Sequence, residues 1–170
     1  MPISALVGKK IYMKKIDDIF FSGTFSGETL SLIAAITTIK KIIKENVPKV
    51  INSLGNNFQL KINELISQNG LEDFIIIDGP KWRPLINIKP LEEKRLLTSL
   101  FKQEFIKQGL LMSASINLCL AHSKKYIINE TIKKWKIILK NIKFYLDSNN
   151  PSKYLEGDLV KPIFEVRKIK

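Results

Sequence analysis

The sequence predicts a mixed α/β fold in which helices pack on a small antiparallel sheet. Apolar residues recur at helical spacing in several long segments. Two short β-rich runs, residues 74–77 and 85–88, flank an Asp-Gly-Pro turn and suggest an antiparallel pair. A third short apolar run, residues 3–7, ends at Gly8 and is predicted to be a buried strand. A chain of 170 residues, 45% of them hydrophobic, is long enough to bury a core.

A short helix is expected over residues 9–16, with its lysines facing outward. Asp17 and Asp18 follow it. No histidine or cysteine lies near this pair, so we interpret it as a solvated helix end rather than as a metal or acid–base site.

The next stretch, residues 20–39, joins a small-residue loop to an apolar segment and reads FFSGTFSGETLSLIAAITTI. Gly23 and Gly27 allow the backbone to bend and to approach a ligand closely. Ser26 or Gly27 is the expected cap of the helix that follows. The unpaired N–H groups of a helix start, with the Thr24 hydroxyl, suit a phosphate. From spacing alone, a capped helix that enters a core is favoured over a phosphate site.

Two helices should follow this loop. The first, residues 28–44, carries so little polar surface in its first half that we expect that half to be buried. Pro48 suits the first position of the second helix, which has an apolar face and stops at Gly70. Gly55 in its middle is unfavourable for a helix.

The second half of the chain contains the predicted hairpin and two further helices. We expect helices over residues 91–108 and from a Ser123 cap to about residue 146, and a third strand over 110–116. The last helix carries one apolar stripe: Ile132, Trp135, Leu139, Ile142 and Leu146. On the hairpin connection, Trp82 is expected to pack and Arg83 to lie on the surface. A substrate contact is the alternative for both.

Three polar features of the second half have ordinary structural interpretations. Cys119, the one cysteine, is expected to be a small core residue in a reducing compartment. His122, the one histidine, is expected to hydrogen-bond at a helix start rather than to act as an acid or base. A lysine stripe flanks the last helix and is expected to be a solvated face: Lys133, Lys136, Lys140 and Lys143.

The net charge of +12 comes almost entirely from lysine, since only Arg83, Arg95 and Arg167 are arginines. Sequence-reading nucleic-acid interfaces favour arginine with interleaved aromatic residues, so specific nucleic-acid binding is not expected, although polyanions should attract the chain nonspecifically. No membrane span and no signal peptide are recognised, and a cytoplasmic location is expected.

The amino-acid sequence of the loop is more specific than the spacing of its glycines. GTFSGETLSLIAAITTI resembles a motif in the C-terminal half of class III, fold-type I pyridoxal-phosphate aminotransferases, in particular the glutamate-1-semialdehyde 2,1-aminomutase-like branch. The opening MPISALVGKK is similar to the segment that follows the Schiff-base lysine in that family, and Ala121-His122 resembles the "AH" before its last helix. The resemblance covers roughly residues 1–149.

The resemblance implies a fold and a site. Residues 1–15 would end the large cofactor-binding domain, residues 16–149 would supply the cofactor-phosphate loop and the C-terminal small domain, and residues 150–170 would form a tail of unknown role. Family members are homodimers. The threonine that matches Thr24, with the backbone at Gly23, would contact the phosphate of pyridoxal 5'-phosphate in the neighbouring subunit.

The resemblance also sets expectations about activity. The Schiff-base lysine would lie upstream of Met1, and neither Lys9 nor Lys10 matches its position, so this chain by itself is expected to be an inactive fragment with no catalytic residue of its own. Glu28-Thr29 replaces the Asn-Pro usual after the second glycine, so another small amino or keto substrate, such as an amino sugar, stays possible. The rival interpretation is a non-enzymatic basic helical module that binds nucleic acid or a partner protein; a decayed gene product is a third.

Overall fold

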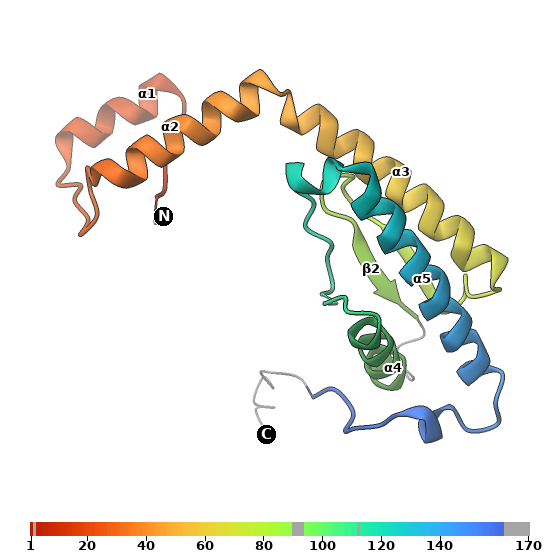
Figure 1. Ribbon diagram of the computed structural model, residues 1–170. Coiled ribbons are helices and arrows are strands. Elements are labelled where there is room, and N and C mark those ends of the chain that lie inside the picture. The colour runs from red at the N-terminus through yellow and green to blue at the C-terminus, as the bar shows by residue number, and fades with distance from the viewer. Residues whose placement is uncertain (2, 90–93, 112, 162–170) are drawn as a thin grey trace, which may run out of the picture. The chain divides into compact units, whose positions relative to one another are not determined.

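The computed structural model describes residues 1, 3–89, 94–111 and 113–161 (Figure 1). The chain divides into two compact units, Met1–Val47 and Pro48–Lys170, called unit 1 and unit 2 below. The predicted domain boundary near residue 15 stays a prediction. No helix among the described residues combines the length and the apolar character needed to cross a membrane.

Unit 1 consists of short and long helices joined by extended chain. Helix α1, Lys10–Met13, continues into the 3-10 helix η1, Lys14–Asp18, and α2 covers Thr29–Lys44. Lys41 and Lys44 lie in the last turn of α2, where positive charge complements the helix dipole. Asp17 and Asp18 lie exposed in η1, consistent with a solvated helix end.

Two predictions of burial in unit 1 are wrong. Residues 3–7 form no strand and are exposed, because a strand needs a hydrogen-bonded neighbour and the described residues of unit 1 contain no strand at all. Leu30 and Ile33, in the first half of α2, are 58% and 56% exposed, and Ser31 is the one buried residue of that helix. Unit 1 does not itself supply a surface that covers these apolar side chains.

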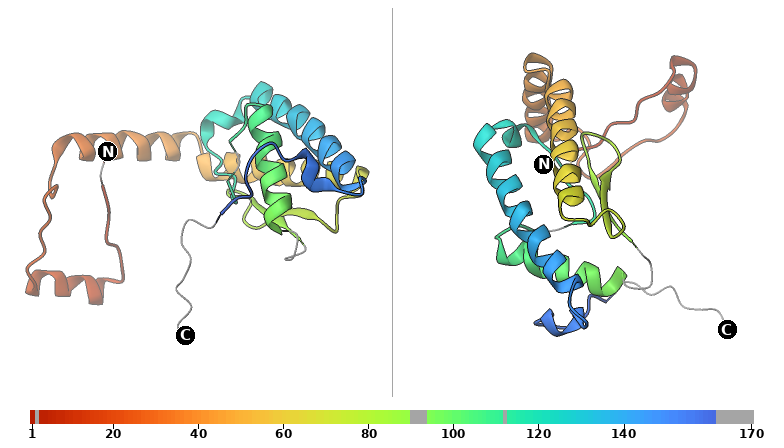
Figure 2. Two further views of the ribbon diagram at one scale, coloured as in Figure 1. Left: turned by 90° about the horizontal axis from the view of Figure 1, so that it is seen from below. Right: turned by 90° about the vertical axis from the view of Figure 1, so that its right-hand side faces the viewer.

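Unit 2 combines three long helices with a two-stranded sheet (Figures 1 and 2). Its helices are α3, Val47–Gln68, α4, Lys94–Lys107, and α5, Lys125–Leu146. Strands β1, Ile75–Asp78, and β2, Leu85–Ile88, pair antiparallel, with Ile75 opposite Ile88 and Asp78 opposite Leu85. The mixed α/β class and the predicted hairpin are therefore confirmed.

The core of unit 2 is centred on Trp135 of α5, whose side chain is 1% exposed. Its ring meets Phe105 of α4 edge-on, with ring centroids 4.8 Å apart, and Phe58 of α3 at 6.3 Å. The same stripe of α5 buries Leu139 and Ile142, as its spacing predicts. Figure 1 shows α3 and α5 running side by side.

Polar side chains of α3 form hydrogen bonds with the backbone of the hairpin. The amide of Asn63 both donates to the Ile77 carbonyl at 2.7 Å and accepts from the Ile77 N–H at 2.9 Å. Gln59, which is buried, donates to the carbonyls of Asp78 and Gly79 at the turn. Sheet and helix are thus joined through backbone groups that would otherwise be unsatisfied.

The described part of the predicted tail is an integral part of unit 2. After the 3-10 helix η3, Pro151–Tyr154, the Tyr154 ring stacks on Tyr145 at 4.5 Å between centroids. Ser99 of α4 accepts from the Val160 N–H at 2.9 Å. The edge strand predicted over residues 163–166 lies outside the described residues.

Four smaller expectations for unit 2 are corrected. The third strand over residues 110–116 reduces to one bridge, Leu85 with Ser115, in the described part of that segment. Lys124, not Ser123, caps α5. Trp82 is 56% exposed and does not pack. Cys119 is exposed because its segment runs outside the core between the sheet and the 3-10 helix η2, Leu120–Ser123.

Candidate functional site

The loop that precedes α2 folds as two successive tight turns. The Ser26 N–H donates to the Gly23 carbonyl at 2.9 Å, and the Glu28 N–H donates to the Phe25 carbonyl at 3.2 Å. Gly27 has φ +78°, a left-handed conformation that a residue with a side chain adopts only with strain. The predicted bend at Gly27 is therefore confirmed.

This loop lines a cavity of about 860 Å³ within unit 1. The extended residues 3–6 and the start of α2 complete its lining. Thr24 lies in this lining and is exposed. A Cβ atom added to Gly23 would meet nothing within 4 Å, so internal packing does not require a glycine there. The missing side chain leaves room for a group that approaches the loop from outside.

Glu28 caps α2, in place of the predicted Ser26 or Gly27. Its carboxylate accepts from the Leu30 N–H at 2.9 Å and from the Ser31 N–H at 2.6 Å. The Ser31 side chain, and then the Ser31 N–H, hold the pKa of the Glu28 carboxyl below its usual range. Glutamate is not among the residues preferred at the N-cap position. For this reason the sequence favours the neighbouring Ser26 and Gly27 as caps.

The cap changes which groups of the loop can bind an anion. The N–H groups of Leu30 and Ser31 already hold the Glu28 carboxylate, and the helix start therefore carries its own negative charge. A phosphate at this loop is left with the Thr24 hydroxyl and the backbone around Gly23, which precede the cap. Of the donors expected from the sequence, the Leu30 and Ser31 N–H groups of the helix start are therefore already in use, whereas Thr24 and Gly23 precede the cap.

The loop has the chemistry of a binding element. Within the described residues, no three His, Cys, Asp or Glu side chains gather where they would hold a metal ion. Glu28 is committed to the cap, and the remaining polar groups of the loop are hydroxyls and backbone amides. They donate hydrogen bonds and exchange no protons at neutral pH.

The other sequence-predicted polar residues lie in unit 2. His122 Nδ1 accepts from the Cys119 N–H at 3.0 Å, which confirms its expected role as a hydrogen bonder at a helix start. The Cys119 thiol lies 3.4 Å from the same ring nitrogen. Sequence reasoning missed this pairing because Cys119 was assigned to the core; the i, i+3 spacing of the two residues was the available signal.

Comparisons with known proteins place the chain beside one class of enzyme. It is 30% identical over 105 residues to a 3-aminobutyryl-CoA aminotransferase of Cloacimonas acidaminovorans, covering 59% of this chain and 25% of that protein. It is 27% identical over 78 residues to the glutamate-1-semialdehyde 2,1-aminomutase of Natronomonas pharaonis, covering 44% of this chain and 18% of that protein. No family model matches the chain.

The fold is likewise similar to part of a solved enzyme. The FumI protein of Sphingopyxis sp. MTA144, solved in its PLP internal aldimine form, matches with a TM-score of 0.71 and 20% sequence identity. The match covers 88% of this chain and 36% of FumI. The chain thus spans a quarter or less of the curated relatives it matches. The resemblance to class III aminotransferases that the loop wording predicts is confirmed for this partial length.

Proposed function

We propose that this chain is the C-terminal portion of a pyridoxal-phosphate-dependent aminotransferase or aminomutase. Unit 1 would supply the cofactor-phosphate loop to the neighbouring subunit of a homodimer, and unit 2 would be the small domain. The observation that carries the proposal is the exposed Thr24 on a glycine-bounded loop that lines the cavity of unit 1, within a chain similar to such enzymes.

The residues present fit a phosphate. Thr24 offers a hydroxyl donor, and Gly23 leaves the backbone beside it open to close approach. Lys9 and Lys10 lie at the start of α1 in the same unit and add positive charge at longer range. When bound, the pyridine ring of the cofactor would serve as an electron sink. The part of this chain would be to hold the phosphate and so orient the ring.

The exposed apolar side chains of α2 support the subunit interface in this proposal. Leu32, Ile36 and Ile39 are 46%, 52% and 54% exposed on the helix that the loop begins. Contiguous apolar surface of this kind marks an interface in a folded protein. A second subunit that covered α2 would lie next to the loop, which agrees with a phosphate contact across the dimer.

The test uses pyridoxine 5'-phosphate, because it lacks the aldehyde that would react with this lysine-rich surface. Calorimetry should show tighter binding to the chain than for pyridoxine, which lacks the phosphate. Thr24→Ala should weaken binding of the phosphate ester about tenfold or more, the effect of one hydrogen bond to a charged group. Thr24→Ser keeps the hydroxyl and should bind as the wild type does. Equal affinity for the two ligands, or no effect of Thr24→Ala, contradicts the phosphate role.

A separate expectation concerns turnover by the 170-residue chain alone. No lysine in it matches the family position for the Schiff base, so we expect no transfer of an amino group to a keto acid in the presence of pyridoxal 5'-phosphate. A coupled assay with an amino donor checks this. Robust turnover by the purified chain would overturn the assignment of the catalytic lysine to another segment.

A further inference from the structure

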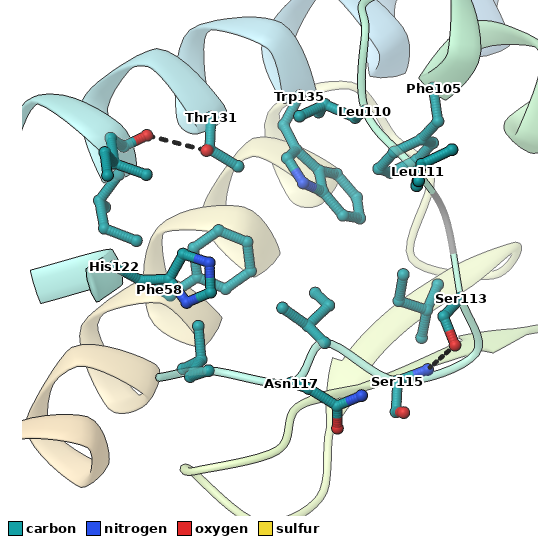
Figure 3. Close-up of a pocket in the computed structure, with 15 residues that line it drawn as sticks. Phe58, Phe105, Leu110, Leu111, Ser113, Ser115, Asn117, His122, Thr131 and Trp135 are labelled. Atoms are coloured by element: carbon teal, nitrogen blue, oxygen red, sulfur yellow. Dashed lines mark hydrogen bonds between the residues drawn. The ribbon is translucent and has the colours of Figure 1, made fainter. Parts of the chain in front are cut away.

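Unit 2 contains a cavity that the cofactor role of unit 1 does not use. It has a volume of about 340 Å³ and lies between α3, α5 and residues 110–111 and 113–118 (Figure 3). Phe58, Phe105 and Trp135 form its deep wall, each 4% exposed or less. A volume of this size falls within the range of small-molecule sites.

The walls are apolar apart from a few polar groups. Leu110, Ile116, Ile127 and Ile128 contribute further apolar lining, and Leu111 also lines the cavity while 96% exposed. None of the described lining residues is an Asp, Glu, Lys or Arg. Such a cavity favours an apolar body and has no fixed charge to neutralise a phosphate or a dication.

Two hydrogen-bond donors border this apolar space. Because His122 Nδ1 accepts the Cys119 N–H, the neutral imidazole carries its proton on Nε2, which is then a donor. Figure 3 shows the indole nitrogen of Trp135 on the side of its ring that faces His122 and Phe58. Among the described residues, no hydrogen bond uses that N–H. Every fully buried side-chain nitrogen or oxygen among those residues has a hydrogen-bond partner, so the Trp135 nitrogen is not fully enclosed. The nitrogen therefore borders the cavity.

The remaining hydroxyl on α5 is already committed. Thr131 donates to the Ile127 carbonyl at 2.8 Å, as Figure 3 also shows. On the side of the cavity formed by α5 and η2, the groups left for a ligand are thus donors, from His122 and Trp135. The other polar lining residues lie on the segment across the cavity from α5 (Figure 3): Ser113, Ser115 and Asn117. Donors on one side of an apolar cavity recognise an acceptor at one end of an apolar molecule, and a carboxylate is the strongest such acceptor.

We propose that this cavity binds a small monocarboxylate with an apolar body, its carboxylate at His122 and Trp135 and its body against Phe58 and Phe105. An apolar cavity of about 150 Å³ accommodates benzene. By proportion, a cavity of about 340 Å³ accommodates a molecule of roughly a dozen non-hydrogen atoms. The proposal does not depend on the cofactor role of Thr24.

The chain provides its own spectroscopic test because it has two tryptophans. In a proton–nitrogen correlation spectrum of the full chain, the indole N–H of Trp135 reports on the cavity. That of Trp82, which is 56% exposed and does not line the cavity, reports nonspecific binding. Trp82→Phe assigns the two signals. The probes are 4-phenylbutyrate and 4-phenylbutylamine, which share an apolar body and differ in the end group.

Phenylbutyrate should shift the Trp135 signal saturably, with one site per chain. The Trp82 signal should stay in place. Phenylbutylamine should bind at least tenfold more weakly than phenylbutyrate. His122→Phe removes the donor and should weaken phenylbutyrate about tenfold or more. His122→Gln keeps an N–H and should retain most of the affinity. Absence of a saturable shift at Trp135, equal affinity for the two probes, or unchanged affinity in His122→Phe would each overturn the proposal. The comparison of phenylbutyrate with phenylbutylamine tests the proposal on the wild-type chain, so the outcome does not depend on a variant that folds.

Discussion

At the residue scale, Gly55 shows how one position reports a tertiary contact. In an exposed helix interior, glycine is unfavourable by about 1 kcal/mol relative to alanine. Gly55 is buried in the middle of α3, and a Cβ atom there would lie 1.5 Å from the Lys81 carbonyl oxygen. The backbone of the hairpin connection therefore approaches α3 as closely as a glycine allows.

We predict that Gly55→Ala destabilises unit 2 despite its better helix propensity. The added methyl must displace backbone rather than a flexible side chain, and overpacking of this kind costs about 1–3 kcal/mol. Urea unfolding followed by the fluorescence of buried Trp135 measures the change. Asn57→Ala, at an exposed position of the same helix, is the matched control and should be neutral or slightly stabilising. A stabilised Gly55→Ala protein would show that the approach of Lys81 is not as close as described.

At the element scale, α2 depends on a cap that also alters its electrostatics. Most helices that bind anions leave their first N–H groups to the ligand. In α2, the Glu28 carboxylate takes two of them, which fixes the start of the helix. Under the proposed phosphate role, the donors that remain are those before the cap, at Thr24 and Gly23.

The start of α2 should consequently respond to acid. Because the folded-state pKa of Glu28 is lowered, its contribution to stability is present above the ordinary glutamate pKa and is lost as the pH falls through the lowered value. Hydrogen exchange of the Leu30 and Ser31 amides, measured against pH, should show protection that disappears in acid. Glu28→Gln keeps an acceptor without a charge and should give protection that does not titrate. Glu28→Ala should leave both amides unprotected at every pH.

At the scale of the whole molecule, the two units differ in how well they cover their own apolar surface. Unit 2 encloses a continuous core that joins its three helices and its sheet. Unit 1 leaves aromatic and aliphatic side chains in solvent, among them Phe20 at 97% exposure and Val7 at 83%. Exposed surface of this extent is unfavourable in water unless another surface covers it.

We therefore predict that the chain self-associates through α2. Sedimentation should give a mass above the 19.5 kDa monomer, and salt should not dissociate the assembly because the contact is apolar. The double variant Ile33→Lys, Ile36→Lys should sediment as a smaller species. Leu60→Lys is the matched control, since Leu60 is 61% exposed on α3 of unit 2, and it should associate as the wild type does. A monomeric wild-type chain would contradict this prediction.

The sequence by itself determined the class of elements and much of the core. The spacing of Trp135, Leu139 and Ile142 predicted the buried stripe of α5, and the Asp-Gly-Pro turn predicted the hairpin, because both patterns are local. The wording around Gly23 and Thr24 indicated the family, which sequence comparison bears out over part of the chain.

Only the tertiary structure decided which apolar runs are covered and which polar groups meet. Residues 3–7 and α2 have the composition of buried elements, yet burial depends on a partner surface, which composition does not specify. The choice of Glu28 as cap, the pairing of Cys119 with His122, and the cavity beside Trp135 likewise follow from chain geometry. The cap, the pairing and the cavity each depend on distances between groups. Residue spacing in the sequence determines such distances only within a single helix or strand.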